Sequence, residues 1–92
     1  EVIHVTVTKY APTGQRTASG EWPEKGMCAT SDRTIPFNTY IYIPALQITC
    51  RVADRTALWV HDKFGATVDL FSLESEKEML QFGRQKKLAI IL

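Results

Sequence analysis

Residues 51–56 read RVADRT and residues 67–72 read TVDLFS, and each short run sets one aspartate beside apolar residues. Runs of this kind, bounded by polar residues, are typical of β-strands. An ionised carboxylate inside such a strand costs free energy unless it is paired, hydrogen-bonded or used. Two interpretations stay open. Asp54 could cap a turn while Asp69 lies on the wet face of a strand, or the two could form one site.

The strand pattern recurs outward from these two runs along the whole chain. Branched and aromatic residues alternate with polar ones, which predicts about six short strands. The segments with this pattern are Val2–Thr8, Met27–Ser31, Ile35–Leu46, Gln47–Ala53, Thr56–Val60, Ala66–Phe71 and Lys87–Leu92. Between the first two lies Ala11–Gly26, a polar segment with prolines and glycines that predicts a long loop of functional character.

One helix is predicted late in the chain. Ser75 followed by Glu78 is a capping-box pattern, and Gly83 stands where a helix would stop. Leu73, just before these signals, and Met79, Leu80 and Phe82 between them supply an apolar stripe. We therefore expect an all-β domain of six strands with one short late helix. Closure into a small barrel would remove the exposed edges of such short strands.

Composition places the chain among ordinary globular domains. Its 92 residues, 45% hydrophobic and 23% charged, suit one domain with one modest core. The net charge of +1 gives no sign of nucleic-acid binding, and GRQKK (residues 83–87) is too short a basic run to change this. No apolar run approaches the roughly 20 residues of a membrane helix. The first and last segments are strand-like without tails, so we expect residues 1–92 to be one domain of a longer protein rather than a mature product.

Cys28 and Cys50 are the two cysteines, and their separation matches no common zinc or redox spacing. A disulfide in an exported domain and two buried thiols in a cytoplasmic one are equally compatible with this pair. His61 beside Asp62 could be a metal ligand or a base, but one such pair is a weak signal and is more typical of a solvent-facing turn, so we expect no metal site and no cofactor.

Several motifs, taken in order, resemble a known family. They are TKYAPTGQRTASG (residues 8–20), CATSDRTIPFNTYIYIP (28–44), VADRT (52–56), VDLFS (68–72) and EMLQFGRQKKLAIIL (78–92). Together they are similar to the 3D domain, named for three aspartates, of the double-psi β-barrel superfamily. That superfamily includes the catalytic domain of MltA-type lytic transglycosylases, the RlpA-like proteins and the expansins. The resemblance implies a six-stranded double-psi β-barrel with a glycan-binding groove, and the usual activity is cleavage of peptidoglycan strands.

The resemblance also assigns roles to individual residues. Asp69 matches the aspartate expected to act as acid and base, and Asp54 matches the partner that helps to set its charge. Thr17 and Ser19 match the TASG loop that lines the groove. In addition, four aromatic rings could stack on sugar rings: those of Tyr10, Trp22, Tyr40 and Trp59. For Tyr40 and Trp59 a place in the core is the commoner alternative, and Trp22, inside the polar loop, is the better groove candidate.

The sequence departs from the family pattern at three positions. Ser31 stands where the first aspartate is expected, and the adjacent Asp32 would point to the opposite face of a strand. Thr56 replaces a glycine, and so does Asn38, although asparagine tolerates a left-handed backbone.

Two functions from different classes follow. The first is an enzyme domain, bacterial or phage-borne, that cleaves peptidoglycan glycan strands without a cofactor, acting at the cell envelope, outside the cell or in a virion. Glycosidic cleavage needs a carboxylic acid that is still protonated near neutral pH, and the apolar neighbours of Asp69 favour that state. The second is a glycan-binding or structural module of a virion or secreted machine with the same barrel. An Asp32 turned away from Asp54 and Asp69 would favour this second function.

Overall fold

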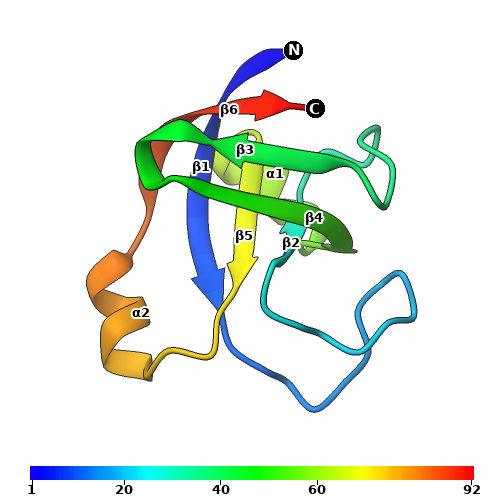
Figure 1. Ribbon diagram of the computed structural model, residues 1–92, viewed down its shortest axis with the longest axis vertical. Helices are drawn as coiled ribbons and strands as arrows, with labels where there is room; N and C mark the ends of the chain where they lie inside the picture. Colours follow the sequence, from blue (N-terminus) through cyan, green and yellow to red (C-terminus); the bar gives the residue numbers. More distant parts are fainter.

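A computed structural model describes residues 1–92 and shows six strands closed into a barrel in the order β1-β5-β2-β4-β3-β6 (Figure 1). The elements in chain order are β1 Val2–Tyr10, β2 Met27–Thr30, β3 Tyr40–Ile43, the 3₁₀ turn Pro44–Leu46, β4 Ile48–Arg55, α1 Leu58–Phe64, β5 Thr67–Phe71, α2 Glu76–Phe82 and β6 Gln85–Ile91. The prediction of a six-stranded barrel is confirmed.

The barrel is mixed, because two of its six strand pairs are parallel. β1 runs parallel to β5, as their arrows in Figure 1 show, and β2 runs parallel to β4, while the other four pairs are antiparallel. Parallel neighbours need crossover connections rather than hairpins. β1 and β2 are not paired with each other, because β5 lies between them, and the long loop that joins them carries the chain across β5. At the top of the barrel the two ends of the chain lie together, and the Ile91 N–H donates to the Glu1 carbonyl oxygen.

Alternation along the strands fills the barrel interior with small and branched side chains. The buried cluster consists of Val5, Val7, Cys28, Ile41, Ile43, Cys50, Val52, Val68, Leu70 and Ala89. Cys28 and Cys50 form a disulfide inside this core, which joins β2 to β4. The two cysteines are therefore bridged rather than free thiols. A second, smaller cluster of Met27, Ala53 and Phe71, with Tyr10 packed against it, lies apart from the main core.

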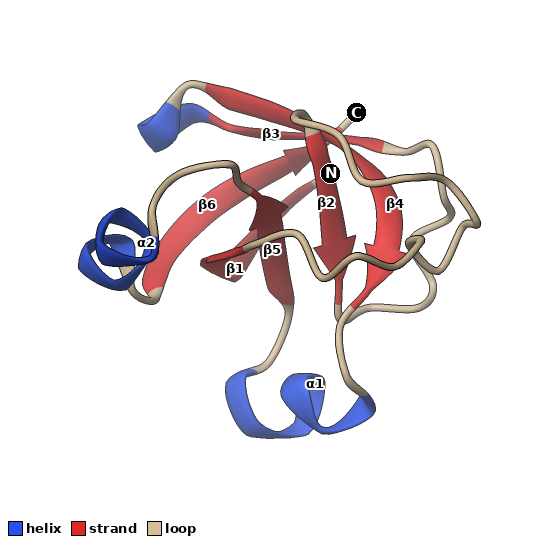
Figure 2. Ribbon diagram, turned by 90° about the horizontal axis from the view of Figure 1, so that it is seen from below, coloured by secondary structure: helices blue, strands red, loops and turns tan.

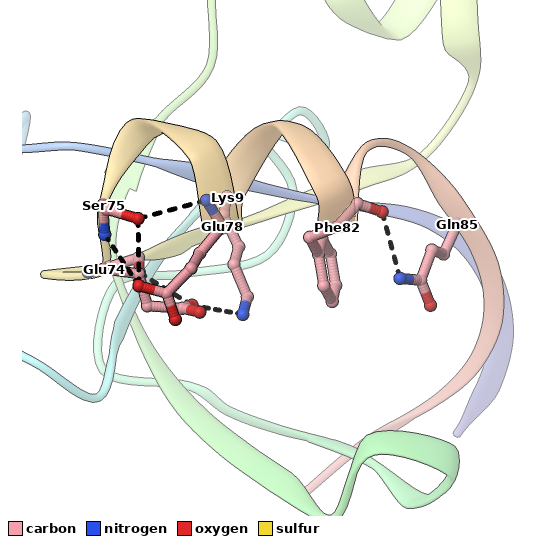
Figure 3. Close-up of polar contacts among 7 residues, drawn as sticks. Lys9, Glu74, Ser75, Glu78, Phe82 and Gln85 are labelled. Atoms are coloured by element: carbon pink, nitrogen blue, oxygen red, sulfur yellow. Dashed lines mark hydrogen bonds and ion pairs between the residues drawn. The ribbon is translucent and has the colours of Figure 1, made fainter.

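The late helix α2 begins and ends as predicted. Ser75 accepts a hydrogen bond from the Glu78 N–H, and the Glu78 carboxylate accepts one from the Ser75 N–H, so the capping box is complete (Figure 3). Gly83 ends the helix with a φ of 60°. On the neighbouring strand, Lys9 forms an ion pair with Glu74, and its ammonium lies over the ring of Phe82.

The prediction of a strand at Thr56–Val60 and of a single helix is wrong. Residues 58–64 form a second helix, α1, which Figure 2 shows on a different side of the barrel from α2. Leu58 and Trp59 remain 74% and 58% exposed, because this short helix packs only a small part of its surface on the barrel. Trp59 therefore does not lie in the core. Tyr40 does not either, because it is 51% exposed on the outer face of β3, in alternation with the buried Ile41 and Ile43. Neither helix has the length and hydropathy needed to span a membrane.

Candidate functional site

The short strand β2 sets Asp54 and Asp69 on either side of one alanine. Ala29 pairs with Asp54 of β4 on one side and with Asp69 of β5 on the other. Neighbouring strands lie about 4.8 Å apart, so the two aspartate Cα atoms are separated by roughly 10 Å across Ala29. Ala29 contributes only a methyl group between the two strands that carry the carboxylates, and it is itself 3% exposed.

A β-bulge brings Asp54 to this face of the sheet. Cys28 pairs with Val52, but the next residue, Ala29, pairs with Asp54, so Ala53 is the extra residue. In strict alternation with the interior Val52, Asp54 would point into the core. Bulges commonly re-aim a side chain in this way. The extra residue thus turns Asp54 outward, toward the loop between β1 and β2 and the same face as Tyr10.

Asp69 is partly buried and has one side-chain partner. The Thr8 hydroxyl, from the paired position on β1, donates to Asp69 Oδ1 at 2.8 Å. Burial raises the pKa of the Asp69 carboxyl to about 6, and the nearby Asp54 carboxylate adds to this rise, while the Thr8 hydrogen bond opposes it. Asp69 Oδ2 has no partner, and since no fully buried side-chain oxygen lacks one, this atom is open to solvent. Oδ2 is therefore the atom that can exchange a proton with a ligand.

Asp54 is held by three donors from three elements. Its Oδ1 accepts hydrogen bonds from the backbone N–H groups of Ala18 and Arg55, at 2.9 and 2.8 Å. Its Oδ2 accepts a longer bond, 3.3 Å, from the Tyr10 hydroxyl. Burial and the charges of Asp54 and Asp69 raise the pKa of Tyr10 above its ordinary value, so its hydroxyl stays protonated and remains a donor. Tyr10, Asp54 and Asp69 thus lie together, as the resemblance implies for the aspartates.

The TASG loop contributes its backbone to the site. The Ser19 N–H donates to the Ala53 carbonyl oxygen of β4, which places the Ala18 N–H against Asp54. The hydroxyls of Thr17 and Ser19 bond to each other at 2.9 Å and to Glu21, so they stabilise the turn itself. This structural use accounts for the burial of Thr17, which is 6% exposed.

Trp22 lies farther along the same loop and makes no contact with either aspartate. Its ring is stacked against the Arg16 guanidinium, 4.6 Å from the ring centroid, and is 54% exposed. The neighbouring Glu21 forms an ion pair with Arg51 of β4, which ties this part of the loop to the barrel. An aromatic surface is thus available to a ligand, but outside the immediate surroundings of the aspartates.

Asp32 lies away from the aspartate pair. Its Oδ1 accepts hydrogen bonds from the N–H and the hydroxyl of Thr34, which lower the pKa of Asp32, and it lines a separate pocket of about 340 Å³. Ser31, at the position of the expected first aspartate, is 4% exposed. Its hydroxyl oxygen accepts from the Thr67 N–H and lies 2.9 Å from His61 Nδ1, so it joins β2 to β5 and α1.

The other two departures are accommodated locally. Asn38 adopts a φ of 74°, as expected for an asparagine in place of glycine, and Thr56 needs no positive φ. The Thr56 N–H instead donates to the Thr30 carbonyl oxygen and extends the pairing of β4 with β2.

Three contributors were not predicted as site residues: Thr8, Ala18 and Ala29. The spacing of Thr8 and Tyr10 places both side chains on one face of a strand, a signal that could have indicated Thr8. The Ala29 position depends on strand order and the Ala18 N–H on loop geometry, so neither has a sequence signal. No group of three or more His, Cys, Asp or Glu side chains is arranged to hold a metal ion. In comparisons with known proteins, no family model and no curated protein matches this chain.

Proposed function

We propose that this chain is a double-psi β-barrel domain of the 3D type that cleaves the glycan strands of peptidoglycan. The observation that carries the proposal is the pair of carboxylates, Asp54 and Asp69, flanking Ala29 on one outward face of the sheet. The mixed six-stranded barrel with two parallel pairs is compatible with the double-psi topology.

Asp69 is the acid in this mechanism. With a pKa of about 6, about a tenth of the Asp69 carboxyl groups keep the proton at pH 7, whereas fewer than about one in a thousand would at the ordinary value of 3.8. Oδ2 gives that proton to the glycosidic oxygen as the C1–O bond breaks and an oxocarbenium-like transition state forms. The resulting Asp69 carboxylate then takes the proton from the 6-hydroxyl of the same sugar. The 6-oxygen bonds to C1, so a 1,6-anhydro ring forms without water and Asp69 recovers its proton.

Asp54 and Tyr10 support this chemistry. The Asp54 charge near Asp69 disfavours ionisation of Asp69 in the resting state. As the bond breaks, the carboxylate of Asp54 would stabilise positive charge on the sugar ring, and the Tyr10 hydroxyl holds that carboxylate in place. Thr8 fixes Asp69 Oδ1 and leaves Oδ2 to face the substrate.

The buried disulfide favours a location outside the cytoplasm. Disulfides persist in oxidising compartments, so Cys28–Cys50 fits the extracellular space, the cell envelope or a virion, where peptidoglycan is the accessible polymer.

A second function, glycan binding without cleavage, is favoured by the position of Asp32. Its carboxylate is hydrogen-bonded to Thr34, and a serine stands at the expected first aspartate, so only two acids, Asp54 and Asp69, flank Ala29. A barrel with this pair could retain a glycan as a binding or structural module.

Digestion of purified sacculi followed by mass spectrometry of the released fragments separates the two functions. We expect fragments with 1,6-anhydro ends from the wild-type protein. Asp69→Asn should lower the rate by at least about 100-fold, since a general acid typically supplies that much. Asp62→Asn, which changes an exposed aspartate of α1, is the matched control and should cleave normally.

Each other outcome has a definite meaning. Reducing ends would indicate hydrolysis through a water activated by the second carboxylate. No release with retained sacculus binding would establish the binding module instead. Unchanged cleavage by Asp69→Asn would exclude Asp69 as the acid.

A further inference from the structure

One pocket lies beside the aspartate pair and does not include it. Its volume is about 690 Å³. β2 and β5 pair only as far as Cys28 and Leu70, and the pocket opens where the two strands separate. The next outward-facing side chains, Met27 and Phe71, form part of its lining. Barrel mouths are a common position for ligand pockets.

The pocket is connected to the aspartate site through the small apolar cluster. Met27 and Phe71 belong to that cluster together with Ala53, and Tyr10 packs on it. The Phe71 and Tyr10 rings meet edge to face at 5.5 Å, and the Tyr10 hydroxyl bonds to Asp54. Since Phe71 is two residues from Asp69, the pocket begins about 7 Å along β5 from the acid. One ligand could therefore occupy both places.

The charge of the lining favours an anionic group. Lys9 and Glu74 line the pocket as an ion pair, visible in Figure 3, and the Ser72 hydroxyl donates to the same Glu74 oxygen. Lys25 also lines the pocket and has no ion-pair partner. The lining thus carries one uncompensated positive charge above an apolar floor.

We propose that this pocket is a subsite for a short peptide that carries a carboxylate, with the exposed Lys25 as the cationic contact and the exposed Leu73 as the main apolar contact, beside the largely buried Met27 and Phe71. A sugar would present hydroxyls and would leave the ammonium without a counter-charge, whereas a peptide acid offers both apolar side chains and an anion. The inference rests on the proposed function, because it makes the substrate a glycan with an attached peptide rather than a bare glycan.

Binding measurements by NMR titration test the subsite without requiring cleavage. The probes are a disaccharide with its tetrapeptide from digested peptidoglycan, the same disaccharide after an amidase has removed the peptide, and the free tetrapeptide as acid and as C-terminal amide. We expect the peptide-bearing disaccharide to bind at least about ten-fold tighter than the bare one, and the peptide acid to shift the Met27, Phe71 and Leu73 amide signals. Lys25→Gln should weaken the peptide acid about three- to five-fold, the range of a partly exposed ion pair.

The matched control is Lys63→Gln, on α1 at the opposite end of β4 and β5, which should leave the affinity unchanged. Equal affinity for the two disaccharides, equal affinity for acid and amide, or equal loss in the two lysine variants would each overturn the subsite. Cleavage of bare and peptide-bearing glycan at equal rates would overturn only this inference. Peptide binding with no cleavage at all would support the subsite and would count against the proposed enzyme.

Discussion

The raised pKa of the Asp69 carboxyl suits the proposed chemistry but lowers the stability of the fold at neutral pH. Its carboxyl pKa is raised from 3.8 to about 6, chiefly by burial, so the folded protein binds this proton more tightly than the unfolded chain does. Stability from this group is complete below about pH 4 and is lost as the pH rises through about 6, where the folded protein must ionise a desolvated carboxyl. At a strand position with no role in a reaction, a neutral residue would give a larger free energy of unfolding at neutral pH than this aspartate does.

Asp69→Asn should therefore stabilise the protein above pH 6. An asparagine keeps an acceptor for the Thr8 hydroxyl and carries no charge. We expect a gain of about 2 kcal/mol in the free energy of unfolding at pH 7.5, somewhat less than the full shift would supply because the side chain is partly exposed. Urea denaturation of both proteins at pH 4.0 and pH 7.5 measures this gain, which should nearly vanish at pH 4.0. A variant that is less stable than wild type at pH 7.5 would show that the charge contributes to folding.

At the scale of elements, helix α2 could be predicted from the sequence because it has side-chain caps, and helix α1 could not because it has none. Helix α2 has a serine cap, a reciprocal glutamate and a terminal glycine, all visible in the sequence. Helix α1 starts at Leu58, and its N-cap residue Ala57 has no side chain that could cap it. The apolar residues of this segment also match the pattern of a short strand. Only Gly65, with a φ of 73°, marked its end. Because strands and short helices share such runs, the assignment depended on contacts that appear only in the folded barrel.

In the candidate site, too, some features could be predicted from local sequence patterns and others depend on contacts between distant residues. The two aspartates could be placed on strands from local patterns and related to each other through the family resemblance. Their separation by Ala29 could not be predicted, since it follows from β2 lying between β4 and β5 and from the bulge at Ala53. Strand order and bulges are set by contacts far apart in the sequence, and no local pattern encodes them.

The capping box of α2 gives a prediction at this scale. Ser75→Ala removes the acceptor for the Glu78 N–H and should cost about 1 kcal/mol. For a domain of this size that corresponds to a decrease in Tm of roughly 4–8 °C. Differential scanning calorimetry measures the decrease, and Ser75→Asp, which keeps an acceptor, is the control and should remain within about 2 °C of wild type. An unchanged Tm in Ser75→Ala, with faster amide exchange confined to α2, would mean that this helix frays independently of the barrel.

At the scale of the whole molecule, the small core of a 92-residue domain supplies limited stability, and the disulfide adds to it. Cys28 and Cys50 are fully buried and lie 22 positions apart. The bridge joins β2 to β4, the strand that also carries Asp54. Cross-linking a loop of this length restricts the unfolded chain and stabilises the fold by about 3 kcal/mol in the chain-entropy model. Typical domains have only about 5–15 kcal/mol in total.

Reduction of this bond should therefore have a large effect on the folded fraction. We expect the reduced protein, and a Cys28→Ala/Cys50→Ala double variant, to lose about 3 kcal/mol or somewhat more, since the alanines also leave a small cavity in the core. Urea denaturation should show a lower midpoint together with a higher m-value, because the unfolded chain without the bridge exposes more surface. The mechanism predicts that adding reductant shifts the wild-type midpoint and leaves that of the double variant unchanged. An equal shift in both would assign the effect to the reductant, and no shift in wild type would show that the barrel does not depend on its internal bridge.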